Sequence, residues 1–170
     1  MKLKDTSYGD MTGKRIHDNI VIRKQGLTSL EGAPADCMGF FDVSYNKLTT
    51  LKFAPAECLK DFDCTDNQLE DLVGAPAFVG GDFNCFGNKL KSLKGAPKEV
   101  FGCFNCSENP TLKNVMDEIM KNGIVANTYI TDEHGLINFK DIKEEFESYH
   151  LRTSVKSKGF RTLLGLKNEI

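Results

Sequence analysis

A repeat of 21 residues is the feature that most constrains the fold of this chain. The segment "DFDCTDNQLEDLVGAP" begins at Asp61, and the closely similar "DFNCFGNKLKSLKGAP" begins 21 residues later at Asp82. A fixed period of roughly 20 to 50 residues indicates stacked structural units rather than one closed globular core. The same spacing of 21 separates four asparagines, Asn46, Asn67, Asn88 and Asn109.

Apolar residues recur at constant positions around each asparagine. A phenylalanine comes five residues before it and a small apolar residue three before, and these two columns are Phe41, Phe62, Phe83, Phe104 and Val43, Cys64, Cys85, Cys106. A separation of two residues places both side chains on one face of an extended strand. One unit cannot bury this face alone, so stacked units are expected to form a continuous core. The asparagine amide, buried at a turn, must bond the backbone on both sides or cost about 1–3 kcal/mol.

The pattern F-x-C/V-x-x-N-x-L-x-x-L-x-x-A-P resembles the leucine-rich repeat, in the short form of about 21 residues that bacterial effectors carry. The strings "SLEGAP", "GGDFNC" and "NKLKSL" are similar to leucine-rich repeat proteins of tailed bacteriophages. The resemblance covers residues 20–112 and implies an α/β repeat: a solenoid with a parallel concave β-sheet, an extended proline-containing convex side and an α-helical C-terminal cap. Gln25 stands where the first asparagine belongs, which indicates a capping repeat. The expected organisation is an N-terminal cap over 1–19, leucine-rich repeats over 20–110 and a helical C-terminal cap and tail over 111–170.

The C-terminal region has a different period. Asn109 as N-cap and Pro110 at the first position predict a helix that ends at Gly123. A turn or short hairpin is expected within 131–142, followed by a second helix from about Phe139 to Leu151. The basic tail has two open interpretations, a third capping helix or a segment that contacts a partner or a nucleic-acid backbone.

The columns between the apolar ones are expected to face outward on the concave sheet. Residues 27–110 contain 7 lysines and 12 acidic residues, a balance of 7 − 12 = −5. An acidic face flanked by aromatic side chains favours a basic partner protein, although a solvated sheet also needs polar residues. Replacing Asp61 and Asp82 by lysine is expected to leave the fold intact and abolish partner capture. The candidate partner-binding residues are Phe40, Asp42, Ser44, Asp61, Asp63, Thr65, Asp82, Asn84, Phe86, Cys103 and Asn105.

Composition narrows the classes of function. The net charge of −2 argues against a general affinity for nucleic acid or anionic membrane. Because the chain has no long apolar run and no export signal, we expect a cytoplasmic protein with reduced cysteines, in a bacterial host cell if phage-encoded. We also expect it to be a monomer. "CFNC", from Cys103 to Cys106, has the spacing of half a zinc site, but its second cysteine lies in the inward column.

The chemistry-bearing residues form no catalytic motif that the sequence reveals. No nucleophile, histidine and carboxylate stand at a recognisable spacing, and no glycine-rich phosphate loop is present. We therefore expect a non-catalytic binding protein without a metal or other cofactor. The resemblance implies a host-directed role, such as inhibition of a bacterial or defence protein. The alternatives are a substrate-selecting adaptor for an enzyme and nucleic-acid contact through the basic tail.

Overall fold

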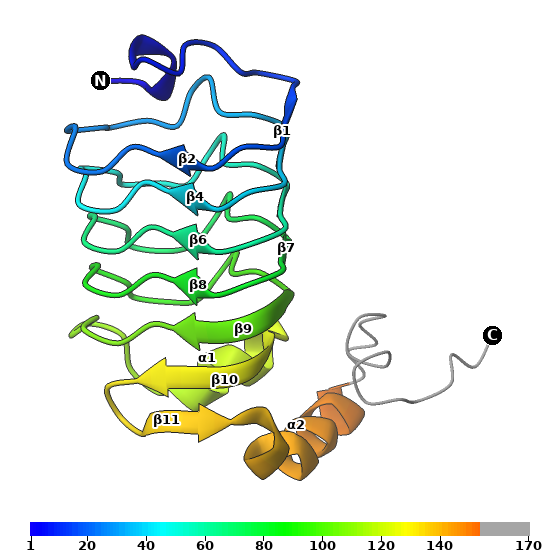
Figure 1. The fold of residues 1–170 in the computed structure, drawn as a ribbon. Helices are drawn as coiled ribbons and strands as arrows, with labels where there is room; N and C mark the ends of the chain where they lie inside the picture. Colours follow the sequence, from blue (N-terminus) through cyan, green and yellow to red (C-terminus); the bar gives the residue numbers. More distant parts are fainter. Residues whose placement is uncertain (154–170) are drawn as a thin grey trace.

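The computed structural model describes residues 1–153, except for the side chains of Glu145 and residues 150–153, and shows a parallel β-solenoid of about six turns (Figure 1). Most turns contribute two short strands separated by a corner. The strands are β1 (Arg15–Ile16), β2 (Ile20–Val21), β3 (Asp36–Cys37), β4 (Phe41–Asp42), β5 (Glu57–Cys58), β6 (Phe62–Asp63), β7 (Phe78–Val79), β8 (Phe83–Asn84) and the longer β9 (Glu99–Asn105).

The strands form two parallel rows that meet in β9. The side row contains β1, β3, β5, β7 and the start of β9, and the front row contains β2, β4, β6, β8 and the end of β9. Register advances by 21 residues per turn without a shift, so that Phe41 pairs with Phe62 and Phe62 with Phe83. The regular sequence period therefore becomes a regular stack, as Figure 1 shows for the labelled front strands.

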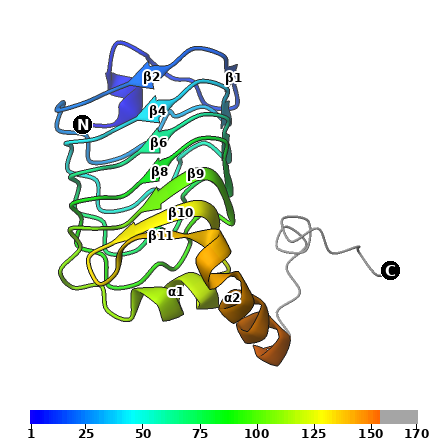
Figure 2. The same ribbon diagram turned by 60° about the horizontal axis from the view of Figure 1, so that its bottom comes forward.

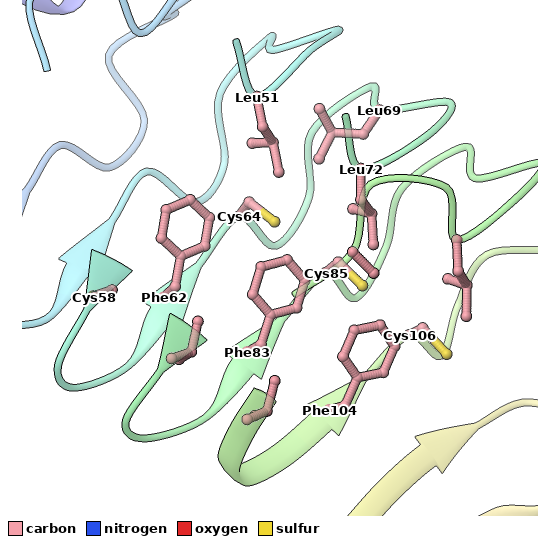
Figure 3. Packing of buried hydrophobic residues seen from close by; sticks show 14 of the residues in the cluster. Leu51, Cys58, Phe62, Cys64, Leu69, Leu72, Phe83, Cys85, Phe104 and Cys106 are labelled. Carbon is pink, nitrogen blue, oxygen red and sulfur yellow. The ribbon is translucent and has the colours of Figure 1, made fainter. Parts of the chain in front are cut away.

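The core lies between the front row and the opposite wall of each turn. Neighbouring rings of the phenylalanine column are stacked, with centroids 5.4–5.5 Å apart and ring planes within 9° of parallel. Figure 3 shows Phe62, Phe83 and Phe104 facing the same interior as the cysteine column. All of these side chains are buried, and the six cysteines are free thiols. The expected inward columns are thus confirmed.

Each repeated asparagine joins two turns through its amide group. Asn67 Oδ1 accepts a hydrogen bond from the Leu48 N–H of the preceding turn at 2.9 Å. Its Nδ2 donates to the carbonyls of Val43, Cys64 and Thr65 at 3.1–3.2 Å. This pattern recurs at the other three asparagines, including Asn109, and confirms that the amides bond the backbone.

Phe53 occupies a position that is glycine in the neighbouring turns. Gly74, one turn later, has a φ of 96°, and a Cβ there would lie 2.7 Å from the carbonyl of Leu51. Phe53 has a φ of 74°, in the left-handed region that costs an ordinary residue about 1–2 kcal/mol. Its ring is half exposed, with Lys52 Nζ 4.9 Å from the ring centroid.

The N-terminal segment covers the first turn of the solenoid. A short 3-10 helix, η1 (Leu3–Asp5), places the side chain of Leu3 in the core. The backbone N–H of Leu3 donates to Ser29 O at 3.1 Å, which ties this segment to the turn beneath it.

The C-terminal region contains two helices and a hairpin. Helix α1 (Val115–Asn122) ends at Gly123 as predicted, but its predicted start at Asn109 is wrong because Asn109 belongs to the asparagine ladder. The N-terminal N–H groups of α1 at Asn114 and Val115 instead donate to the carboxylate of Glu133, each at 3.1 Å.

Strand β10 (Val125–Thr131) follows and adds a further parallel strand beside β9. The cap is therefore not purely helical. β10 forms the expected hairpin with β11 (Gly135–Asn138), and α2 (Phe139–Thr153) begins where the second helix was predicted. Figure 2 shows both helices near the C-terminal end of the stack, and Figure 1 shows α1 behind β10, on the opposite wall of that turn. The predictions for the basic tail beyond Thr153 lie outside the described residues.

Candidate interaction surface

Just before each front strand the chain turns a corner, and at two of these corners an aspartate accepts a hydrogen bond from the backbone of the next turn. Asp61 Oδ1 accepts the N–H of Asp82 at 2.9 Å, and Asp82 Oδ1 accepts the N–H of Cys103 at 2.8 Å. In the first turn an amide does the same work, because Asn19 Oδ1 accepts the N–H of Phe40 at 3.1 Å. The two aspartates remain exposed. At these three corners the side chain supplies an acceptor oxygen, and either a carboxylate or an amide can do so, whereas the corner at Phe40 has no side-chain acceptor.

Glycines make room for these acceptor oxygens. A Cβ on Gly81 would clash with Asp61 Oδ1, and a Cβ on Gly102 would clash with Asp82 Oδ1. Where the preceding corner holds Phe40, the corresponding position is Lys60 instead of glycine. This pairing of an acidic or amide residue with a glycine 20 positions later was the sequence signal for the corner, and sequence reasoning missed it.

A second column, four residues before each asparagine, forms turns within its own repeat. Asp63 Oδ1 accepts the N–H of Thr65 at 2.9 Å, and Asn105 Oδ1 accepts the N–H of Ser107 at 3.1 Å. Asn84 makes the equivalent bond to Phe86 at 3.4 Å. A carboxylate and an amide again serve the same local purpose, since both side chains accept the N–H two residues on.

Three residues expected on the outer surface are buried. Asp42 is 3% exposed, Ser44 1% and Thr65 7%. Asp42 forms an ion pair with Arg23, a residue that sequence reasoning did not single out, and its Oδ1 also accepts the Ser44 hydroxyl at 2.7 Å. The strands here are only two residues long, so the chain turns before strict alternation could carry these side chains to the surface. These three side chains therefore lie beneath the exposed surface and are not available to contact a partner.

Asp63 is a half-buried carboxylate that lies near Arg23, whose guanidinium forms its ion pair with Asp42 instead. Burial raises its pKa above the ordinary value of 3.8, and the negative charge of Asp42 raises it further. Among the side chains that the structure describes, no lysine or arginine forms an ion pair with Asp61, Asp63 or Asp82. The front face, the outer surface of β4, β6 and β8 with the corner residues beside them, therefore carries three carboxylates outside the described ion pairs, and Arg23 partly offsets the charge at Asp63.

A small pocket opens between these carboxylates and the ring of Phe40. Its volume is about 170 Å³, and Arg23, Asp42, Asp61 and Asp63 contribute to its walls. Phe40 is half-buried, so its ring borders the pocket without closing it. The structure thus brings Phe40, Asp61 and Asp63 together, with Asp82 on the next turn.

The remaining predicted residues lie toward the C-terminal half of the same face. Asn84, Phe86, Cys103 and Asn105 are all partly exposed. Burial raises the pKa of the Cys103 thiol, so that its reactivity at neutral pH is reduced. Across the described residues, no three histidine, cysteine or acidic side chains are grouped so that they could hold a metal ion.

Comparison with models of known protein families, with curated proteins and with solved structures gives no significant match. No helix within the described part of the chain combines the length and the apolar character needed to cross a membrane.

Proposed function

We propose that this protein is a non-catalytic binding module of the leucine-rich repeat class, and that its acidic front face binds a basic partner protein. A cytoplasmic host protein is the kind of partner that the resemblance to phage-encoded repeats favours. The observation that carries the proposal is the presence of carboxylates at positions where the fold needs only an acceptor oxygen. Asn19 accepts the same kind of backbone bond in the column of Asp61 and Asp82, which is the corner column. Asn84 and Asn105 do so in the column of Asp63, four residues before each repeated asparagine.

The charges of Asp61, Asp63 and Asp82 are therefore not required by the backbone bonds that these residues make. At Asp63 the charge opposes folding, because burial favours the neutral form of the carboxyl group. Charged groups that the backbone bonds do not need, and that lie outside the described ion pairs, are suited to steering and orienting a partner of opposite charge. A basic side chain of the partner fits beside Asp61 and Asp63, where the ring of Phe40 can also contact a cation.

The test uses amide replacements, because they remove charge and keep the acceptor oxygen. Lysine replacements are unsuitable, since Asp61→Lys and Asp82→Lys would each remove the acceptor for a backbone N–H. The test variant is Asp61→Asn with Asp63→Asn and Asp82→Asn.

The control changes the net charge by the same amount on other surfaces. It combines Glu70→Gln, Asp71→Asn and Asp117→Asn, three residues outside the front face. Immobilised wild type, test and control proteins are compared in affinity capture from bacterial lysate with quantitative mass spectrometry. We expect wild type and control to retain the same basic protein and the test variant to lose it. Equal retention by all three, or retention of acidic proteins only, would refute the proposal.

A further inference from the structure

An apolar cluster lies on the side row, around the corner from the front face. Leu59 directly follows β5, Phe78 belongs to β7 and Phe101 belongs to β9. Leu59 is 43% exposed and Phe101 is 54% exposed. The rings of Phe78 and Phe101 meet edge to face, with centroids 5.2 Å apart and an interplanar angle of 74°. Large side chains held together on a surface in this way are candidates for a contact with another molecule.

The cluster has a gap at Gly80. Leu59, Gly80 and Phe101 occupy the same position in successive turns, each 21 residues apart. A Cβ on Gly80 would clash with the carbonyl oxygen of Leu59, so this position can hold no side chain without a shift of the backbone. Two turns of a parallel stack separate Leu59 from Phe101, about 10 Å at the usual strand spacing. Gly80 therefore contributes only backbone to the surface between Leu59 and Phe101, and the Leu59 carbonyl occupies the position of the absent Cβ.

Carboxylates border the apolar cluster on two sides. The chain turns the corner after Leu59 and reaches Asp61 two residues later, and after Gly80 it reaches Asp82. On the other side, Glu57 and Glu99 pair with Phe78 in the register of the side row. The surface thus combines an apolar centre with acidic margins, and one of these margins is the corner column of the front face.

We propose that the basic partner binds through an amphipathic segment, whose apolar side chains pack on Leu59, Phe78 and Phe101 while its flanking lysines or arginines meet the carboxylates. This inference rests on the proposed function and identifies the part of the partner that is recognised. Apolar anchors supply binding free energy and the charged margin supplies orientation. A second copy of this chain is a poor occupant, because two such surfaces would bring like charges together. An anionic membrane surface is repelled for the same reason.

Two synthetic peptides serve as probes. The first is a helical peptide of about 18 residues made of leucine and lysine with the leucines on one face, and the second carries glutamine in place of each leucine at the same charge. Binding is measured by fluorescence anisotropy at several salt concentrations. We expect wild type to bind the leucine peptide at least about ten-fold more tightly than the glutamine peptide.

Three variants separate the contributions. Leu59→Ser with Phe101→Ser should abolish the preference for the leucine peptide and leave the salt-dependent binding of the glutamine peptide. The matched control, Phe53→Ser with Leu136→Ser, removes exposed apolar side chains elsewhere and should keep the preference. Lys60→Gln removes the cation that follows Leu59 and should tighten binding of both peptides.

The outcomes distinguish this inference from the proposed function. If the amide variant at Asp61, Asp63 and Asp82 binds both peptides as wild type does, the charge-based function itself is wrong. If that variant weakens binding but the Leu59 and Phe101 variant keeps the leucine preference, only the amphipathic contact is wrong. Dimerisation of wild type that the Leu59 and Phe101 variant abolishes, or equal binding of wild type to anionic lipid vesicles, would also overturn the inference.

Discussion

Replacing Asn67 by alanine tests whether the asparagine ladder holds successive turns together. The Asn67 side chain makes four hydrogen bonds, one with a backbone N–H and three with backbone carbonyls. Each of the three carbonyls keeps another hydrogen-bond donor when the side chain is removed. Val43 O also accepts from Asn46, Cys64 O from Asn88, and Thr65 O from the backbone N–H of Tyr45.

The cost can be worked out from these contacts. The backbone N–H of Leu48 bonds Asn67 Oδ1 and would be left buried without a partner, at about 1–3 kcal/mol. The three bonds from Nδ2 contribute about 0.5–1.5 kcal/mol each, but their carbonyls keep a second donor, so we count the lower end of that range. The sum predicts a loss of about 2.5–4.5 kcal/mol in the free energy of unfolding.

Urea denaturation followed by circular dichroism measures this loss, and amide hydrogen exchange locates it. The neighbouring exposed residue provides the control, because Gln68→Ala should change stability by less than about 0.5 kcal/mol. Exchange at the Leu48 amide should accelerate in the Asn67→Ala protein even under conditions where the remaining core is protected. If Asn67→Ala costs no more than Gln68→Ala, or if the Leu48 amide stays protected, the ladder does not stabilise the stack as argued.

The strained residue Phe53, the half-buried Asp63 and the accessible thiol of Cys103 provide further tests. Because Phe53 is in the left-handed region, Phe53→Gly should be more stable than Phe53→Ala by about 0.5–1 kcal/mol in urea denaturation, and the usual preference for alanine would contradict the assigned backbone. Since the folded state raises the pKa of Asp63, wild type should lose stability relative to Asp63→Asn as the pH rises from about 3 to about 7, and the reverse trend in paired urea titrations would contradict its burial. Iodoacetamide should label Cys103 first in the native protein, whereas burial raises the pKa of Cys64 and Cys85 and delays their labelling until denaturation, as mass spectrometry would show.

The stacked architecture could be predicted because a strict repeat gives both the local structure and the neighbours of each residue. The period of 21 identifies Phe62 as the residue that contacts Phe41 and Phe83, without knowledge of the remaining fold. The phase breaks after Asn109, and prediction weakens there. Tyr129 pairs with Phe104 although 25 residues separate them, because α1 lies between the two strands.

The burial beneath the candidate face could not be predicted from alternation alone. The rule that side chains alternate holds along a strand, but β4 ends at Asp42 and the chain then enters a turn. Ser44 is therefore held against the Asp42 carboxylate and does not point into solvent. The ion pair of Arg23 with Asp42 could not be predicted from the repeat either. Asp42 lies 19 residues after Arg23, in a different column of the next turn, so the period of 21 does not relate the two residues.

The equivalence of aspartate and asparagine on the front face has a consequence for how such a protein can evolve. Since both residues accept the same backbone N–H groups at the corner, a mutation between them changes the electrostatic pattern while the scaffold keeps its bonds. Selection can then adjust which partners are attracted one position at a time, without an intermediate that fails to fold. Substitutions between aspartate and asparagine at these corners would therefore let a lineage with this architecture keep its fold while its binding surface follows a changing target.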